Sequence, residues 1–364
     1  MYLRKREEMK STSEAMPSGA SRLTFTPMGG LARTAVSCAI GVMALGACAQ
    51  APVLKLSRTI SLGSAGKFDH LAIDLAGNRL FVAATGNHSV EVIDLKTDKV
   101  QQSITGLGKP HGLAWVGGSL YVADGTLKEL QVYSGAPLAL AGKIKLSDDA
   151  DDMVYDAPSH LLFVGHGGSD AANPARVAVV DTSNFSLVAN LPVATHPEAL
   201  EIDPATERVF VNVADAGEVV VIDAKTKAIA AHWKLTKAAD NVPLVFDGAQ
   251  HRLYIACRTP GTLIAVDTTT GKEVTSIASA GGADDLFFDE ALHRIYLISG
   301  AGEVDPYQVD DSLAIHALPV LHTAAGAKTA LFVQDQNLLY VGVPGVGAHP
   351  AEVRVYSTAA SGAK

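Results

Sequence analysis

Short apolar runs alternate with clusters of polar turn residues along most of this chain. Residues 198–235 show the pattern clearly, with β-rich segments separated by Asp, Pro, Gly and Thr. One segment, residues 219–222, is apolar at every position, which is typical of a strand covered on both faces. The pattern therefore predicts an all-β protein made of many short strands, with sheets packed against one another.

The same unit recurs seven times, and each copy has an apolar residue, which we call the anchor, followed by an aromatic residue. The anchors are Leu71, Leu113, Met153, Leu200, Leu244, Leu286 and Leu331. The aromatic residues are Phe81, Tyr121, Phe163, Phe210, Tyr254, Tyr296 and Tyr340. Successive anchors are 42, 40, 47, 44, 42 and 45 residues apart. A period of about 40–50 residues with four short strands per unit predicts a seven-bladed β-propeller.

The last repeat supplies only three of its four strands. Residues 330–333, 338–342 and 352–356 have strand character, and a tail rich in Ser, Ala and Gly follows them. Residues 53–62 resemble the outer strands of the other repeats. We therefore predict that this N-terminal strand completes the last blade and closes the ring, which removes exposed strand edges. The predicted propeller domain covers residues 52–364.

Residues 1–51 lie outside the repeat and have the features of an export signal. Arg33 precedes the apolar run 35–45, which small residues follow. This run is too short to span a bilayer as a helix. Residues 45–48 resemble a bacterial lipobox, which would make Cys48 the lipidated first residue, whereas residues 47–49 offer an ordinary cleavage site instead. We expect an exported protein, either periplasmic or anchored to the membrane through Cys48.

The charge balance restricts the partners of the domain. Residues 1–51 hold six of the 29 basic and three of the 38 acidic residues, so 23 basic and 35 acidic residues remain, a net charge of −12. Such an acidic domain disfavours nucleic acid and anionic lipid surfaces as partners. We expect a monomer that touches a membrane only through its lipid anchor. Cys257, the one cysteine beyond the export segment, is expected to be a buried strand residue.

Two stretches of the chain resemble a known repeat. Residues 80–94 (LFVAATGNHSVEVID) and 209–223 (VFVNVADAGEVVVID) are similar to the YVTN-type β-propeller repeat. The resemblance extends over essentially all of residues 53–357. It implies an exported bacterial propeller, and it is specific for the fold and weak for the activity, because propellers support many functions.

Superposing the repeats separates structural positions from candidate functional ones. The aromatic position is filled in every repeat, so we expect it to pack one blade against the next. The loops that lead into the first strand of each repeat differ instead in chemistry. Two residues before the anchors stand Asp69, His111, Asp151, Glu198, Val242, Asp284 and Thr329. In a propeller these loops meet at one mouth of the central channel, together with the loops between the second and third strands.

This mouth gathers the candidate site residues. The ligand-binding candidates are Asp69, His70, His111, Asp151, Asp152, His166, His196, Glu198, Asn241, Arg258, Asp284, Asp285 and Lys328. Carboxylates held together favour a compensating cation, so we predict a divalent ion, either Ca²⁺, Mg²⁺, Mn²⁺ or Zn²⁺. The metal-ligand candidates are Asp69, Asp151, Glu198 and Asp284. Two alternatives remain: a mixed His and carboxylate site for a transition metal, and carboxylates that only hydrogen-bond the backbone of a neighbouring blade.

Three functions are compatible with this face. The first, which we favour, is an exported binding module that holds a small polar ligand or a cation at the channel mouth. The second is a metal-dependent lactonase- or lyase-type enzyme, with His111, His166 or His196 as general base. The third is a lipid-anchored scaffold for protein partners. The sequence contains no nucleophile elbow, phosphate-binding loop or paired-cysteine site that would indicate a more defined chemistry.

Overall fold

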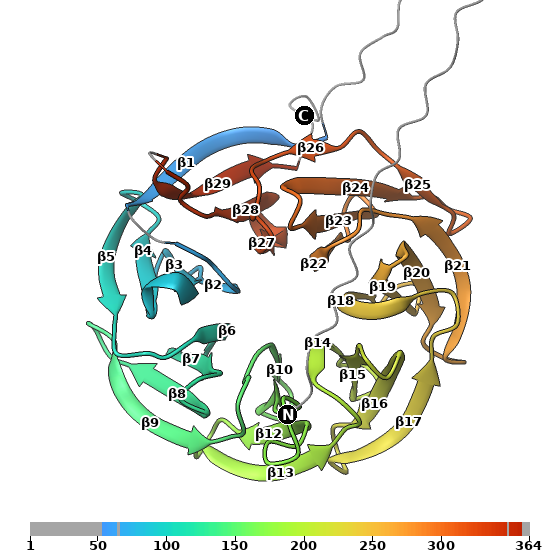
Figure 1. The fold of residues 1–364 in the computed structure, drawn as a ribbon, viewed down its shortest axis with the longest axis horizontal. Coiled ribbons are helices and arrows are strands. Elements are labelled where there is room, and N and C mark those ends of the chain that lie inside the picture. The colour runs from blue at the N-terminus through green and yellow to red at the C-terminus, as the bar shows by residue number, and fades with distance from the viewer. Residues whose placement is uncertain (1–52, 64–65, 348, 359–364) are drawn as a thin grey trace, which may run out of the picture. The chain divides into compact units, whose positions relative to one another are not determined.

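The computed structural model describes residues 53–63, 66–347 and 349–358, which form a β-propeller (Figure 1). The predicted export segment, including Cys48, lies outside the described residues. Among the described residues, the strands form seven sheets, in agreement with the seven repeats. The same part of the chain contains no helix of the length and apolarity needed to cross a membrane.

Each blade is an antiparallel sheet whose strands follow one another outward from the axis (Figure 1). The innermost strands are β2 (Leu71–Asp74), β6 (Pro110–Val116), β10 (Met153–Asp156), β14 (Pro197–Asp203), β18 (Ala239–Asp247), β22 (Ala283–Asp289) and β27 (Ala330–Val333). The second strands are β3 (Arg79–Ala84), β7 (Ser119–Asp124), β11 (Leu161–His166), β15 (Arg208–Val213), β19 (Arg252–Thr259), β23 (Arg294–Ser299) and β28 (Leu338–Val343).

The third and fourth strands complete each blade. The third strands are β4 (Ser89–Asp94), β8 (Glu129–Ser134), β12 (Arg176–Asp181), β16 (Glu218–Asp223), β20 (Gly261–Asp267), β24 (Glu303–Val309) and β29 (Ala351–Ser357). The outermost strands are β5 (Lys99–Ile104), β9 (Ala139–Lys145), β13 (Ser186–Pro192), β17 (Ala228–Lys234), β21 (Lys272–Ala278), β25 (Ile315–Ala317) with β26 (Leu321–His322), and β1 (Lys55–Gly63). Two short 3₁₀ turns, η1 (Thr85–Asn87) and η2 (Gln334–Gln336), connect strands within the first and last blades.

The N-terminal strand closes the ring. Strand β1 pairs antiparallel with β29, so that Ile60 lies opposite Val353 (Figure 1). Both side chains are fully buried in the core of the last blade. The seventh blade is therefore built from both ends of the domain, as predicted.

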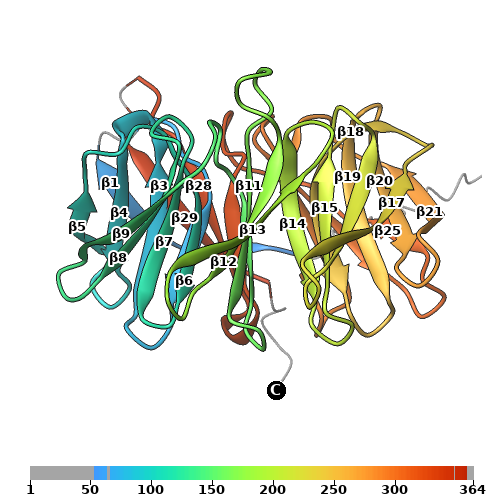
Figure 2. The ribbon, with the colours of Figure 1, turned by 90° about the horizontal axis from the view of Figure 1, so that it is seen from below.

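Seen from the side, the blades stand next to one another around the ring (Figure 2). Aromatic residues pack successive blades together. The ring of Phe81 stacks on Trp115 of the next blade, with centroids 5.3 Å apart. Phe210 contacts Phe246 of the following blade at 5.6 Å. Such pairs contribute about 0.5–1.5 kcal/mol each beyond the area that they bury. The structural role predicted for the aromatic position is confirmed, and Cys257 is fully buried in β19, also as predicted.

Strand pairing corrects the alignment of the seventh repeat by one residue. In the first blade, Leu71 pairs with the residue that follows the aromatic one in the second strand. In the seventh blade this place belongs to Ala330, and Leu331 lies one residue further along. The mouth position, two residues before this corrected anchor, is therefore Lys328 and not Thr329. A leucine resembles the other anchors better than an alanine does, and only the pairing with β28 reveals the register.

Candidate functional site

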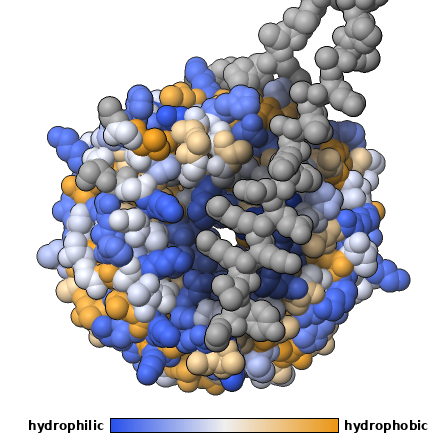
Figure 3. All heavy atoms as spheres, in the orientation of Figure 1, coloured by the Kyte–Doolittle hydropathy of each residue, from blue (hydrophilic) through white to orange (hydrophobic). Residues whose placement is uncertain are grey.

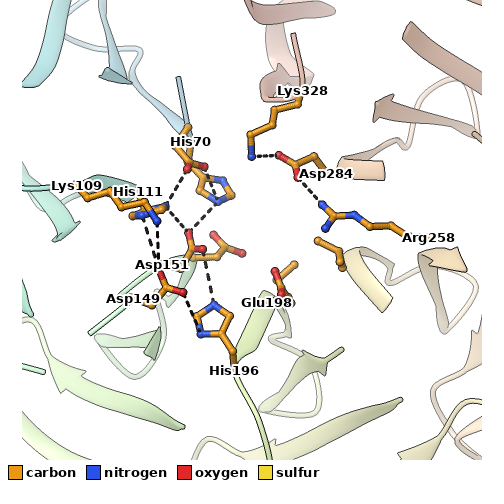
Figure 4. A pocket seen from close by; sticks show the side chains of 14 residues that line it. His70, Lys109, His111, Asp149, Asp151, His196, Glu198, Arg258, Asp284 and Lys328 are labelled. Atoms are coloured by element: carbon orange, nitrogen blue, oxygen red, sulfur yellow. Dashed lines mark hydrogen bonds and ion pairs between the residues drawn. The ribbon is translucent and has the colours of Figure 1, made fainter. Parts of the chain in front are cut away.

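The central channel opens at one face into a cavity of about 230 Å³ (Figure 4). The positions two residues before the anchors, which we call the mouth ring, are Asp69, His111, Asp151, Glu198, Val242, Asp284 and Lys328. All seven line the cavity, together with His70, Asp152, His196 and Arg258. The space-filling view shows hydrophilic residues around a central hollow (Figure 3). The structure thus brings ten of the thirteen predicted ligand-binding residues to one cavity.

Two histidines and two aspartates form a cluster on one side of the cavity; we call Asp69, His70, His111 and Asp151 the His–Asp cluster. The Nδ1 atom of His111 lies 2.8 Å from Oδ2 of Asp69 and 3.5 Å from Oδ1 of Asp151. The Nε2 atom of His70 lies 3.7 Å from Oδ1 of Asp69 and 3.6 Å from Oδ1 of Asp151. Two imidazoles and two carboxylates, supplied by three successive blades, therefore face a common space.

His196 approaches the same cluster from the fourth blade. Its Nδ1 atom donates a hydrogen bond to the carbonyl oxygen of Gly167 at 2.7 Å, which fixes the orientation of the ring. Its Nε2 atom then faces Oδ2 of Asp151 at 3.8 Å. The supporting loop needs glycine at position 168, because φ there is 107° and a Cβ atom would lie 2.7 Å from the backbone nitrogen of His196.

The opposite side of the cavity is formed by one carboxylate between two cations. Asp284 accepts a hydrogen bond from Nη2 of Arg258 at 2.6 Å and another from Nζ of Lys328 at 2.5 Å. Arg258 also donates through Nε to the carbonyl oxygen of Ala283 at 2.8 Å, which holds the guanidinium in place. The cavity is therefore asymmetric, with imidazoles and carboxylates on one side and a neutralised aspartate with excess positive charge on the other.

The His–Asp cluster is stabilised by opposite charges. Burial alone lowers the pKa of His70, but the carboxylates of Asp152 and Asp151 raise it well above its usual value. Burial alone raises the pKa of Asp151, but His196 and His70 lower it well below the usual range. The opposite charges therefore favour the protonated imidazole of His70 and the ionised carboxylate of Asp151 when nothing else occupies the cluster.

Glu198 lies between the two sides of the cavity (Figure 4). Burial raises the pKa of its carboxyl group to about 7, against the opposing effect of His196. Among the described residues, no hydrogen bond or ion pair engages its side chain. Glu198 is therefore a carboxyl group that gains or loses its proton near neutral pH. Its two oxygen atoms are free to bind a ligand in the cavity.

A second cavity of about 230 Å³ continues the channel, and most of the residues that line it are apolar. The anchors of all seven blades, with Ala330 in the seventh, line it. Asp152, Glu201 and Asp285 are the acidic exceptions in this wall, and burial together with the nearby Asp152 raises the pKa of Glu201 to about 8. The channel therefore passes from a charged mouth to an interior lined mostly by apolar residues, in which the carboxyl group of Glu201 is protonated at neutral pH.

Two of the predicted ligand-binding residues hold neighbouring blades together. Asp152 accepts from the backbone N–H of Leu200 in the next blade at 3.1 Å. Asp285 accepts from the backbone N–H of Ala330 at 2.7 Å, and it lines the apolar cavity instead of the mouth. These contacts match the structural alternative considered for such carboxylates.

His166 and Asn241 do not reach the cavity, which corrects the expectation drawn from their loops. His166 is 1% exposed; its Nδ1 accepts from the N–H of Ser147 and its Nε2 donates to Oδ1 of Asn190, both at 3.0 Å. Asn241 is fully buried and donates to Oδ1 of Asn212 at 2.9 Å. Both side chains turn away from the cavity: Ser147 and Asn190 hold His166, and Asn212 of the neighbouring blade holds Asn241.

The four predicted metal-ligand candidates do not converge on one point. Asp284 is already neutralised by Arg258 and Lys328. Among the described residues, Asp69, His70 and Asp151 instead offer ligand atoms that all lie within 4.8 Å of one another. The most compact set of donors is therefore a mixture of imidazole nitrogen and carboxylate oxygen.

Lys109, Asp149 and Glu201 also line the channel, although they were not among the predicted site residues. Glu201 carries a signal in the sequence, because the position after the anchor is apolar in the other six blades. Lys109 and Asp149 are charged residues of the same entry loops. They lie in loops of unequal length, where superposed repeats define no common position.

The fold and the site define a seven-bladed β-propeller with a polar, asymmetric channel mouth. No protein-family model matches the chain. Over 201 residues it is 26% identical to the uncharacterized protein YncE of Salmonella typhimurium, and equally to that of Salmonella typhi. Each match covers 53% of this chain and 54% of YncE, so the chain spans about half the length of these curated relatives.

A solved structure with the same fold belongs to Kuenenia stuttgartiensis hydrazine synthase. It superposes with a TM-score of 0.69 at 15% identity and covers 78% of this chain and 94% of that one. This likeness concerns the fold alone. The homology to YncE and the seven blades agree with the predicted propeller, while membership in the YVTN repeat family stays a prediction.

Proposed function

We propose that this protein is an exported propeller that binds a small polar ligand or a cation at its channel mouth. The observation that supports the proposal is the chemistry of the mouth ring. Its seven equivalent positions hold Asp, His, Glu, Val and Lys side chains around one cavity. A purely structural position keeps one residue type in every blade, as the aromatic position does. Variation on a symmetric scaffold is typical of a binding site.

The arrangement of charge indicates the kind of ligand. Glu198 and the His–Asp cluster offer acceptors and exchangeable protons, and Arg258 offers donors across the same cavity. A small molecule that carries both a carboxylate and a hydroxyl or amino group would satisfy both sides. The volume of about 230 Å³ suits a molecule smaller than typical drug-sized ligands.

The enzymatic alternative has weaker support. A general base needs a free nitrogen at the working pH. Burial opposes protonation, yet Asp151 and the Gly167 carbonyl raise the pKa of His196 to about 9. Asp69 and Asp151 likewise raise the pKa of His111 against the effect of burial. His196 is therefore protonated near neutral pH, and the raised pKa of His111 disfavours its free-base form, which favours binding over base catalysis.

A thermal-shift screen tests the proposal. EDTA-treated protein would be melted with amino acids, hydroxy acids, dicarboxylates and sugars, one at a time. A ligand at about 100 times its Kd stabilises by about 2.7 kcal/mol, or roughly 4 °C for a domain of this size. We expect at least one compound to produce such a shift in the wild type and not in Glu198→Gln.

The matched control is Glu290→Gln, which changes an exposed glutamate outside the channel and should respond like the wild type. A screen without any stabilising compound would refute binding of small polar molecules. An equal response of Glu198→Gln and the wild type would show that the ligand binds elsewhere.

A further inference from the structure

Distances within the His–Asp cluster match a coordination shell better than a set of hydrogen bonds. In a tetrahedral zinc site with bonds of about 2.0–2.1 Å, neighbouring ligand atoms lie about 3.3–3.4 Å apart. The contacts of His70 with the two aspartates measure 3.7 and 3.6 Å, and that of His111 with Asp151 measures 3.5 Å. Charge-assisted hydrogen bonds would draw these atoms to about 2.7–2.9 Å. Only the contact of His111 with Asp69, at 2.8 Å, does so.

His111 provides an independent observation. Its side chain is only 6% exposed, and it lines the cavity from the second blade. Both of its ring nitrogens are buried, and neither makes an aligned hydrogen bond with a described residue. The buried Oδ1 atom of Asp151 also has no hydrogen-bond donor. Buried polar atoms are nearly always satisfied, so an imidazole that is paired only electrostatically, beside a carboxylate oxygen without a hydrogen-bond donor, indicates a missing partner.

The donor types select the class of partner. Calcium and magnesium prefer shells of oxygen ligands, whereas the cluster offers two imidazoles with two carboxylates. Imidazole with carboxylate suits zinc and related transition metals. The second ring nitrogen of His70 lies 3.9 Å from Oδ1 of Asp285, an ion-pair distance that places a carboxylate behind the imidazole.

We infer that Asp69, His70 and Asp151, with His111 held beside them against Asp69, form a binding site for a divalent transition-metal ion of the zinc class. This inference rests on the proposed binding function of the mouth and specifies its cation. The two aspartates neutralise the charge of the ion, and the open cavity leaves room for a further ligand. The Arg258 side of the cavity would then face any anionic group that joins the metal.

Calorimetric titration of the EDTA-treated protein with ZnCl₂ tests the inference. We expect one equivalent to bind to the wild type and CaCl₂ not to displace it. In Asp69→Asn/His111→Gln the affinity should fall by at least about 100-fold, since loss of even an outer partner of a metal ligand costs 10–100-fold. The matched control is Asp310→Asn/His316→Gln, which removes an exposed Asp–His pair with a 2.7 Å contact and should bind zinc like the wild type.

A cobalt spectrum provides a readout that does not depend on how the variants fold. Co²⁺ bound to the wild type in a four-coordinate site of this kind should give a strong visible absorption band, which ZnCl₂ should abolish. Absence of zinc binding to the wild type, or unchanged binding in the cluster variant, would overturn the inference. If a compound from the thermal-shift screen binds the EDTA-treated protein while zinc does not, the metal site falls and the proposed function stands.

Discussion

Acidification is expected to destabilise the folded ring through His166. Its Nδ1 accepts a hydrogen bond from Ser147 and its Nε2 donates one to Asn190, so only the neutral imidazole fits. Burial lowers the pKa of His166 to about 4. A histidine in the unfolded chain has a pKa of about 6.5. Between about pH 6.5 and pH 4, the unfolded state therefore binds more protons than the folded state, and stability is lost as the pH falls.

The magnitude follows from proton linkage. At pH 7 both states carry an essentially neutral His166. At pH 5 the unfolded chain is protonated there and the folded chain is not, which costs about 2 kcal/mol. For a domain of about 300 residues this corresponds to a decrease of roughly 3 °C in Tm.

Equilibrium unfolding in urea at pH 7 and pH 5 measures the effect. The variant His166→Gln keeps an acceptor for Ser147 and a donor for Asn190 but does not titrate. Other titrating groups affect both proteins equally, so the wild type should lose about 2 kcal/mol more than the variant on acidification. The control His349→Gln alters an exposed histidine and should behave like the wild type. An equal loss in the wild type and His166→Gln would refute a neutral, buried His166.

Three further predictions concern the channel and the export segment. Because the pKa of Glu201 is raised to about 8, the folded state holds this proton more tightly than the unfolded chain does. The stability that the protonated carboxyl group contributes is lost as the pH rises from about 4.5 to 8. Glu201→Leu should therefore raise the Tm over that of the wild type more at pH 8 than at pH 5. Asp285→Ala leaves the N–H of Ala330 without its acceptor and should lower the free energy of unfolding in urea by about 1–3 kcal/mol, whereas Asp285→Asn should cost less. Cys48→Ser should abolish incorporation of labelled fatty acid when the full chain is expressed in a bacterium.

Each of these predictions has a contrary outcome. An equal gain for Glu201→Leu at both pH values would mean that Glu201 is hydrated and ionised. An unchanged stability of Asp285→Ala would remove its role between blades. A wild-type chain that is exported without a fatty acid would indicate ordinary signal cleavage in place of lipidation at Cys48.

The sequence by itself determined the architecture of this protein. The number of blades, the aromatic contacts between them and the closure by β1 all follow from patterns that recur within each repeat of about 40–50 residues. Each blade packs only against its neighbours, so local periodicity is sufficient to predict the ring. The convergence of Asp69, Asp151 and Glu198 at one mouth follows from the same rotational arrangement.

Only the tertiary structure decided which of these side chains are available to a ligand. Asp284 is neutralised by Lys328, while His166 and Asn241 turn away from the cavity toward other polar partners. The register of the seventh blade depended on pairing with β28, and so did the place of Lys328 in the mouth ring. These outcomes depend on side-chain directions and on contacts between residues distant in the chain, which a pattern within one repeat does not encode.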